Sequence, residues 1–278
     1  MIVVIAGPTA SGKTDLALKL AKHFDGYILN GDSRQVFKEL NIGTAKPTEK
    51  EIKRSNLKHK LFGHISIDED YNLYKYQKDA FDIIKKNKDK TAFLVGGTGL
   101  YIDSIVYNYE LKESDTKVRK ELENLSVEEL QKRVGKNLKV LNQSDQNNPR
   151  RLIRFLEKSF EKNQKGLELK HLYLVLDIEK EVLEKRVKER VELMFEKGLL
   201  EENKALFEKG KRVDTIGYKE FDDFFEGKIT LNVVKENIFI NTKKYAKRQI
   251  TWFKRNENAI WVKDYKEALT LCQNFLSS

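Results

Sequence analysis

The chain of 278 residues contains little cysteine and little proline. Its single cysteine, Cys272, excludes an intrachain disulfide and a zinc site built from several cysteines. Its three prolines leave no proline-rich linker between independent domains. No apolar run approaches the roughly 20 residues that a membrane-spanning helix needs. Met1 leads directly into the apolar residues 2–6 without a charged leader, so we expect no signal peptide and a reduced, cytoplasmic compartment.

Acidic residues are fewer than basic residues in this chain. The chain has 53 Lys and Arg against 43 Asp and Glu, a formal net charge of +10. Such an excess points to an anionic partner, most often nucleic acid, although lysine is also a common surface residue without a partner. A hydrophobic fraction of 40%, with 15 Phe and 11 Tyr, excludes a wholly disordered chain.

Short apolar runs alternate with helical patterns along most of the chain. This alternation predicts an α/β fold, with a parallel sheet that contains a phosphate-binding loop and carries helices on both faces. The runs expected to form strands are 2–6, 27–29, 91–95, 171–176 and 259–262. Between about 111 and 148 this strand signal disappears, and short charged helices are expected instead. We therefore predict a core formed by residues 1–110 and 149–278, interrupted by a small helical insertion at 111–148 that contacts the anionic partner.

The first strand is followed by a phosphate-loop pattern, G-x-x-x-x-G-K-[ST], which is shared with ATP-binding proteins. Its glycines let successive backbone N–H groups turn toward an anion, and the following helix adds its positive end. Lys13 supplies a full charge, and the Thr14 hydroxyl is placed to bind Mg²⁺. A glycine turn that binds nothing is the alternative, but the strand and helix around the pattern favour a di- or triphosphate site. The expected binding residues are Gly7, Pro8, Thr9, Ala10, Ser11, Gly12, Lys13 and Thr14.

Polar residues follow two other predicted strands. Asp32 and Ser33 come after the strand at 27–29, and Thr98 comes after the strand at 91–95. The carboxyl ends of parallel strands meet at one edge of the sheet, so these residues are expected to face the same crevice as Lys13. Asp32 could act there as a general base or hold Mg²⁺. An aspartate that only caps a turn is the alternative.

Several blocks of sequence together resemble the tRNA dimethylallyltransferase (tRNA isopentenyltransferase) family of bacterial type. They run in the family's order over nearly the whole chain. The phosphate loop is shared with many families, whereas the blocks at 32–37, 41–47 and 246–253 are far more specific. The blocks are Gly-Pro-Thr-Ala-Ser-Gly-Lys-Thr at 7–14, Asp-Ser-Arg-Gln-Val-Phe at 32–37, Asn-Ile-Gly-Thr-Ala-Lys-Pro at 41–47, Val-Gly-Gly-Thr-Gly-Leu-Tyr at 95–101, Asn-Pro-Arg-Arg-Leu-Ile-Arg at 148–154, Gly-Tyr at 217–218 and Ala-Lys-Arg-Gln-Ile-Thr-Trp-Phe at 246–253.

This resemblance implies a concrete reaction. The dimethylallyl group of dimethylallyl diphosphate would move to N6 of the adenosine 3′-adjacent to the tRNA anticodon, position 37, with release of diphosphate. The phosphate loop would then hold the diphosphate donor and Mg²⁺ rather than ATP. By motif position, Asp32 matches the family's proposed general base, and Thr9 and Thr98 would line the reaction channel.

Two basic clusters, at 149–154 and 243–255, are further candidates for contact with tRNA. Cations interleaved with aromatic residues suit phosphate contacts and base stacking, while a solvated helix face is the alternative. Lys247 and Arg248 could equally face the diphosphate. With the segment 32–35 and Arg119 taken from the resemblance, the expected tRNA contacts are Asp32, Ser33, Arg34, Gln35, Thr98, Arg119, Arg151, Arg154, Lys247 and Arg248. We expect the enzyme to be a monomer.

Other functions remain open at this point. A nucleotide-dependent kinase of a small molecule shares the loop and the sheet. A GTPase is disfavoured, because no hydrophobic strand ends in an Asp-x-x-Gly switch and no Asn-Lys-x-Asp pattern is present. A related prenyltransferase could act on free adenosine phosphates. A non-catalytic RNA-binding module could grip backbone phosphate through the loop, but it would leave Asp32 without a role.

Overall fold

The computed structural model of the chain describes residues 1–111, 113, 116–157 and 166–278. The chain divides into two compact units, and each is described by itself below. Unit 1 comprises Met1–Tyr107 and Glu168–Ser278, and unit 2 comprises Asn108–Leu167. Within the described ranges, none of the helices combines the length and the apolar character that crossing a bilayer requires.

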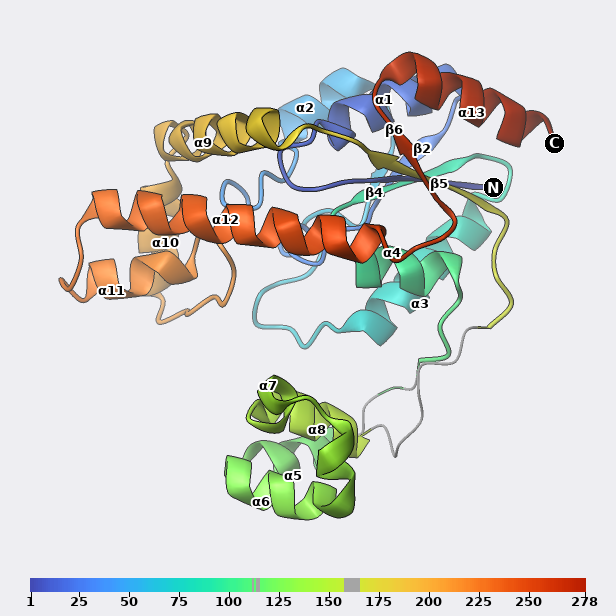
Figure 1. Cartoon of the computed structure of the whole chain (residues 1–278). Coiled ribbons are helices and arrows are strands. Elements are labelled where there is room, and N and C mark those ends of the chain that lie inside the picture. Colours follow the sequence, from blue (N-terminus) through green and yellow to red (C-terminus); the bar gives the residue numbers. More distant parts are fainter. Residues whose placement is uncertain (112, 114–115, 158–165) are drawn as a thin grey trace. The chain divides into compact units, whose positions relative to one another are not determined.

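Unit 1 is built on a sheet of six strands in the order β3-β2-β4-β1-β5-β6 (Figure 1). All of its neighbouring strands pair in parallel. Five strands coincide with the predicted apolar runs, and the sixth, β3, has only two half-buried residues, so no apolar run marks it. The strands are β1 (Ile2–Ala6), β2 (Tyr27–Asn30), β3 (His59–Lys60), β4 (Ala92–Gly96), β5 (His171–Leu176) and β6 (Ala259–Val262).

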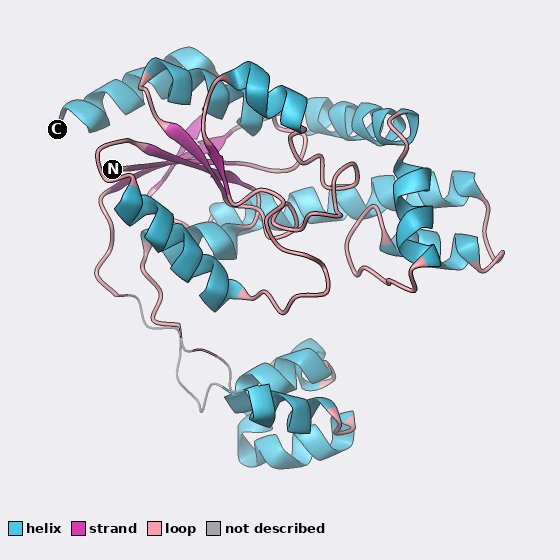
Figure 2. Ribbon diagram, turned by 180° about the vertical axis from the view of Figure 1, so that it is seen from behind, coloured by secondary structure: helices cyan, strands magenta, loops and turns pink. Residues whose placement is uncertain are grey.

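Helices cover both faces of this sheet, as predicted (Figure 2). On one face, Val3 and Ile5 of β1 pack with Leu16 and Leu20 of α1 and with Cys272 of α13. On the other face, α4 contacts β1 and β4 and packs against α3. The helices of unit 1 are α1 (Lys13–His23), α2 (Glu49–Ser55), α3 (Leu73–Lys86), α4 (Gly99–Val106), α9 (Lys180–Glu196), α10 (Leu199–Glu208), α11 (Asp222–Phe225), α12 (Leu231–Phe253) and α13 (Tyr265–Ser277).

The register of the sheet brings three loops together at its carboxyl edge. Ala6 of β1 lies opposite Gly96 of β4, and Asn30 of β2 lies opposite Val95. The phosphate loop, the segment after β2 and the segment after β4 therefore begin at nearly the same level. The last two segments approach so closely that a Cβ on Gly96 would lie 2.1 Å from the carbonyl oxygen of Gly31, and only glycine fits there.

Unit 2 is helical and has a hydrophobic core of its own. It runs farther along the chain than the expected 111–148, because Leu152 and Ile153 of α8 are buried together with Leu122, Leu130 and Val134 of α5 and α6. Residues 149–157, which we assigned to the core, are thus part of the insertion. Its helices are α5 (Thr116–Glu123), α6 (Val127–Val134), α7 (Gln143–Gln146) and α8 (Pro149–Glu157), with a 3₁₀ turn at Gly135–Val140.

Candidate active site

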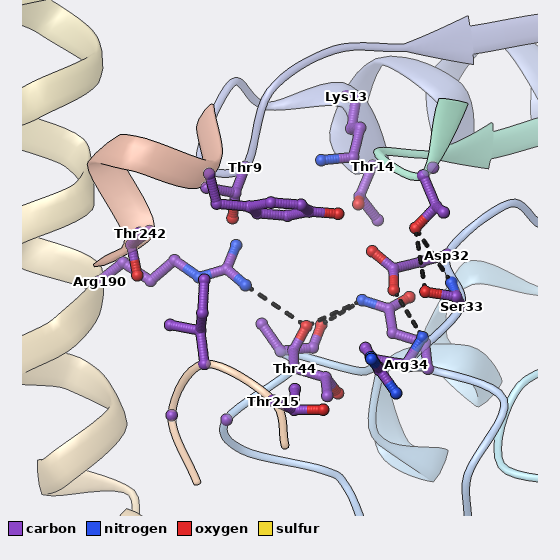
Figure 3. A pocket seen from close by; sticks show the side chains of 18 of the residues that line it. Thr9, Lys13, Thr14, Asp32, Ser33, Arg34, Thr44, Arg190, Thr215 and Thr242 are labelled. Atoms are coloured by element: carbon purple, nitrogen blue, oxygen red, sulfur yellow. Dashed lines mark hydrogen bonds between the residues drawn. The ribbon is translucent and has the colours of Figure 1, made fainter. Parts of the chain in front are cut away.

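A cavity of about 390 Å³ opens at the carboxyl edge of the sheet (Figure 3). The phosphate loop and the segments after β2 and β4 line one part of it. Helices α9 and α12 and the loops at 43–47 and 214–219 line the rest. The structure brings together nine of the residues selected from the sequence: Thr9, Lys13, Thr14, Asp32, Ser33, Arg34, Gln35, Thr98 and Arg248.

The phosphate loop has the conformation that its pattern predicts. Ala10 and Gly12 have positive φ angles of 63° and 94°, which turn the chain sharply before α1 begins at Lys13. The Lys13 ammonium donates to the carbonyl oxygen of Pro8 at 3.2 Å. From α9, the Arg186 guanidinium donates to the carbonyl oxygen of Ser11 at 3.1 Å. The loop thus presents a helix N-terminus and a lysine to the cavity, which suits a phosphate group.

Two cations, Lys13 and Arg190, line the cavity. Burial, together with the nearby charge of Arg190, lowers the pKa of Lys13 to about 8, while Asp32 acts in the opposite direction. Burial likewise lowers the pKa of Arg190, which donates to the carbonyl oxygen of Thr44 at 3.3 Å. In the described part of the chain no carboxylate forms an ion pair with either cation. Such a pair of cations is stabilised by an anion that carries more than one charge.

Asp32 is held at the end of β2 by its neighbours. Its backbone N–H donates to Oδ1 of the buried Asn30 at 2.9 Å. Its own Oδ1 accepts the backbone N–H of Arg34 at 2.9 Å. The carboxylate and the Thr14 hydroxyl both point into the cavity (Figure 3). One carboxylate oxygen is thus fixed by the backbone while the other remains available to a substrate.

Thr98 lies beside Asp32 across the gap between two strand ends. Its Oγ1 accepts the backbone N–H of Ser33 at 3.1 Å and lies 3.3 Å from the Ser33 hydroxyl. Tyr245 of α12 lines the same part of the cavity, and burial and the charge of Asp32 raise its pKa to about 12. The Arg248 guanidinium lies 5.5 Å from the centre of the Tyr245 ring. Lys247 and Arg248 are both exposed, and of the two only Arg248 lines the cavity.

The remaining basic candidates lie in unit 2 and pair with acidic groups there. Arg119 forms ion pairs with Glu123 at 2.9 Å and with Glu157 at 3.4 Å. Arg151 lies 3.7 Å from Asp145, and Arg154 lies 3.9 Å from Glu157. The structure places these three residues in unit 2. Their contact with tRNA stays a prediction.

Four further residues line the cavity without a role predicted from the sequence. Thr44 and Gln249 lie in the blocks at 41–47 and 246–253, Tyr245 lies in the basic cluster at 243–255, and Arg190 lies outside all of these segments. Arg190 lies on a helix dense in charge, and charged helix faces are usually solvated. No local signal separates it from Arg186 and Lys188, which flank the buried Val187 on the same helix.

The chemistry of this site can be stated from its charges. The lining is rich in cations, and Asp32 lies among them as a candidate base. Within the described ranges no cluster of three or more His, Cys, Asp or Glu side chains could hold a metal ion. Mg²⁺ needs no such cluster where substrate phosphates and water complete its shell, and the Thr14 hydroxyl and the Asp32 carboxylate fit that arrangement.

Comparison with known protein families gives a direct match. The model of the family described as IPP transferase matches residues 35–256. The tRNA dimethylallyltransferase of Acholeplasma laidlawii is 40% identical over 260 residues, covering 91% of this chain and 88% of the relative. The enzyme of the same name from Flavobacterium johnsoniae is 38% identical over 289 residues, covering 94% and 92%.

Two solved structures share the fold. The tRNA isopentenylpyrophosphate transferase of Bacillus halodurans has a TM-score of 0.75 and 33% identity, over 99% of this chain and 95% of that one. A eukaryotic dimethylallyltransferase acting on tRNA has a TM-score of 0.82 and 26% identity, over 100% of this chain and 79% of that one. The parallel sheet with its flanking helices is therefore common to this chain and to these enzymes.

Proposed function

The chain belongs to the IPP transferase family and transfers a dimethylallyl group to tRNA, and from this premise we propose that the acceptor is N6 of adenosine 37, beside the anticodon. The observation that carries the proposal is one cavity lined by two half-buried cations, Lys13 and Arg190, and by the carboxylate of Asp32. The cations suit the diphosphate of the donor, and the carboxylate suits an acceptor that must lose a proton. We propose that the enzyme acts as a monomer in the cytoplasm.

The proposed step forms one bond, breaks one bond and moves one proton. The N6 lone pair of adenosine attacks C1 of the dimethylallyl group, and the bond from C1 to the diphosphate oxygen breaks. The electron pair of that bond leaves with diphosphate, and Lys13, Arg190 and the loop N–H groups stabilise the charge that develops. Asp32 accepts the proton that N6 loses. A magnesium ion held by Thr14 and the donor's phosphates would neutralise further charge on the leaving group.

The acceptor base has to leave its stack to reach Asp32. Enzymes that act on a base commonly extrude it into a pocket. The segment 32–35 and Thr98 line the same cavity as the proposed base, and their hydroxyl, amide and guanidinium groups can bond the edges of an extruded adenine. This supports the family's assignment of these residues to tRNA contact.

The proposal is tested by incubating the enzyme with Mg²⁺, labelled dimethylallyl diphosphate and unmodified tRNA, then digesting the RNA and mapping the label. We expect label on N6 of adenosine 37. Free adenosine phosphates are offered in parallel. Label on them alone would show that the acceptor is a free adenosine phosphate rather than tRNA. ATP consumption on a small molecule without prenyl transfer would indicate a kinase, and tRNA binding without product would indicate a binding module.

Donor binding should depend on pH through Lys13. Its pKa of about 8 lies below the ordinary 10.5, so the folded apo enzyme holds this lysine partly neutral above about pH 8. The unfolded chain binds more protons between these two values, and stability contributed by this group therefore rises with pH in that window. A bound diphosphate favours the charged form. We thus expect proton uptake on donor binding near pH 8.5 and weaker donor affinity at higher pH.

Calorimetry in two buffers with different ionisation enthalpies measures this uptake. The Lys13→Met variant should show none of it. Equal proton uptake by the two proteins would assign the effect to another group.

Contacts with tRNA phosphates should appear in the salt dependence of binding. If Arg151 and Arg248 each neutralise one phosphate, replacing either with Ala should reduce the slope of log K against log salt by about one unit. Lys185→Ala is the control, because that lysine is exposed and pairs with Glu189 on α9. A slope identical to that of wild type would show that the tested arginine contacts no tRNA phosphate and only forms part of a solvated helix face.

A further inference from the structure

One buried side chain connects the two sides of the cavity. Gln249 of α12 is only 4% exposed. Its Oε1 accepts the backbone N–H of Thr9 in the phosphate loop at 2.9 Å. Its Nε2 donates to the carbonyl oxygen of Gly97, in the loop after β4, at 2.8 Å. We propose that Gln249 is a positioning residue that sets the separation between the donor-binding loop and the acceptor-binding loop.

This inference rests on the proposed function, because it assigns the two loops to the two substrates. Thr9 belongs to the phosphate loop, which faces the diphosphate. Gly97 directly precedes Thr98, whose hydroxyl accepts the N–H of Ser33 next to Asp32. Three hydrogen bonds and the backbone from Gly97 to Thr98 thus connect the donor loop through Gln249 to the segment that carries the base.

The geometry requires an amide at this position. One atom must accept from an N–H, and a second atom at the same end must donate to a carbonyl. A carboxylate can only accept, an aliphatic side chain can do neither, and asparagine is one methylene shorter. The bridge also explains Gly97, because a Cβ at that position would lie 2.1 Å from Nε2 of Gln249.

The helix that carries Gln249 is itself firmly held. Trp252, about one turn farther along α12, donates through Nε1 to Oδ2 of Asp103 at 2.8 Å. Asp103 belongs to α4 and also accepts the Tyr173 hydroxyl of β5 at 3.0 Å. The Trp252 ring fills the space beside Gly99, where a Cβ would lie 2.1 Å from Cδ1. Gln249 therefore acts from a helix fixed to the sheet.

A separation set in this way affects the rate more than it affects binding. The attacking nitrogen and the allyl carbon must approach to about 3–3.5 Å with the correct alignment, and a shift of about 1 Å can cost a hundredfold in rate. Each substrate keeps its own contacts when the bridge is lost. The expected signature is a reduced transfer rate with nearly unchanged affinities.

The test compares Gln249→Leu with Gln249→Glu in single-turnover transfer of the dimethylallyl group to tRNA across pH 5.5–8.5. We expect Gln249→Leu to lose about 10- to 100-fold in rate at every pH. Gln249→Glu should lose as much at high pH, where its carboxylate faces the Gly97 carbonyl. At low pH the protonated Glu regains a donor for Gly97 and keeps an acceptor for Thr9. Its rate relative to wild type should therefore rise as pH falls.

Gln77→Glu is the matched control. Gln77 is also buried, donates to the carbonyl oxygen of Ser104 at 2.7 Å and does not line the cavity. It should lower the melting temperature without a pH-dependent recovery of rate. Dissociation constants for tRNA and for dimethylallyl diphosphate should stay within about threefold of wild type in both Gln249 variants.

Three results would overturn the inference: a pH-independent ratio for Gln249→Glu, a wild-type rate for Gln249→Leu, or a loss confined to substrate affinity. Failure of the proposed function is separate, since the wild-type enzyme would then transfer no label. In that case amide hydrogen exchange at Thr9 tests whether Gln249 holds the phosphate loop through the Thr9 N–H. Unchanged protection in Gln249→Leu would overturn it, and faster exchange would support it.

Discussion

Replacing Asp32 with Asn should reduce the single-turnover rate of dimethylallyl transfer by about 10²- to 10⁴-fold, the usual contribution of a general base. The amide cannot take the proton from N6. Its oxygen can still accept the backbone N–H of Arg34, the contact that now orients the carboxylate at 2.9 Å. The local structure should therefore survive, and the dissociation constant for tRNA should stay within a few fold of wild type.

The control for this variant is Asp25→Asn, which removes one negative charge from an aspartate side chain that is 88% exposed. Its transfer rate should equal that of wild type. Rapid quench with labelled donor separates the chemical step from product release. A rate for Asp32→Asn within threefold of wild type would contradict the base assignment and return Asp32 to a turn or metal-binding role.

Replacing Lys13 with Met should lower kcat/KM for the donor by about 10²- to 10³-fold, as expected when one group that stabilises developing charge is removed. Arg190→Gln should have an effect of the same order. Both cations face one diphosphate in our proposal, so the double variant should lose less than the product of the two single losses. The binding of tRNA measured without donor should change little for Lys13→Met, because our proposal assigns Lys13 to the diphosphate of the donor.

An exposed lysine on the same helix, Lys22, provides the control as Lys22→Met. Initial rates at varied donor concentration, at saturating tRNA, give the required constants. Multiplicative losses in the double variant would show that the two cations act on different groups. An unaltered kcat/KM in Lys13→Met would contradict the proposal that the phosphate loop binds the donor.

The catalytic edge of the sheet could be predicted because each of its parts has a local signature. A buried run, a turn pattern and a polar residue at the strand end predict that Lys13, Asp32 and Thr98 share one crevice, and all three line the cavity in the structure. Arg190 and Gln249 could not be predicted in the same way. Both lie on long helices, and their importance depends on which loops those helices meet in the fold.

The contact between two of the sequence blocks likewise could not be predicted. The blocks at 41–47 and 217–218 are recognisable in the sequence, but the sequence does not show that they touch each other in the fold. In the structure the Tyr218 ring lies so close to Gly43 that a Cβ there would be 2.5 Å from it. Glu202 of α10 joins the two blocks by accepting the N–H of Ile42 at 3.0 Å and the hydroxyl of Tyr218 at 2.6 Å. Pairings between distant segments of this kind have no local pattern.

The way in which unit 2 is inserted bears on how this enzyme can evolve. The chain leaves the core after Tyr107 and returns at Glu168, and two backbone hydrogen bonds close the exit, from Leu169 to Val106 at 3.0 Å and from Gly166 to Asn108 at 2.8 Å. The free energy of closing such a loop grows only with the logarithm of its length. Residues between these points can therefore be added, lost or exchanged among lineages without moving a strand of the catalytic sheet, so the insertion can diversify while the chemistry is retained.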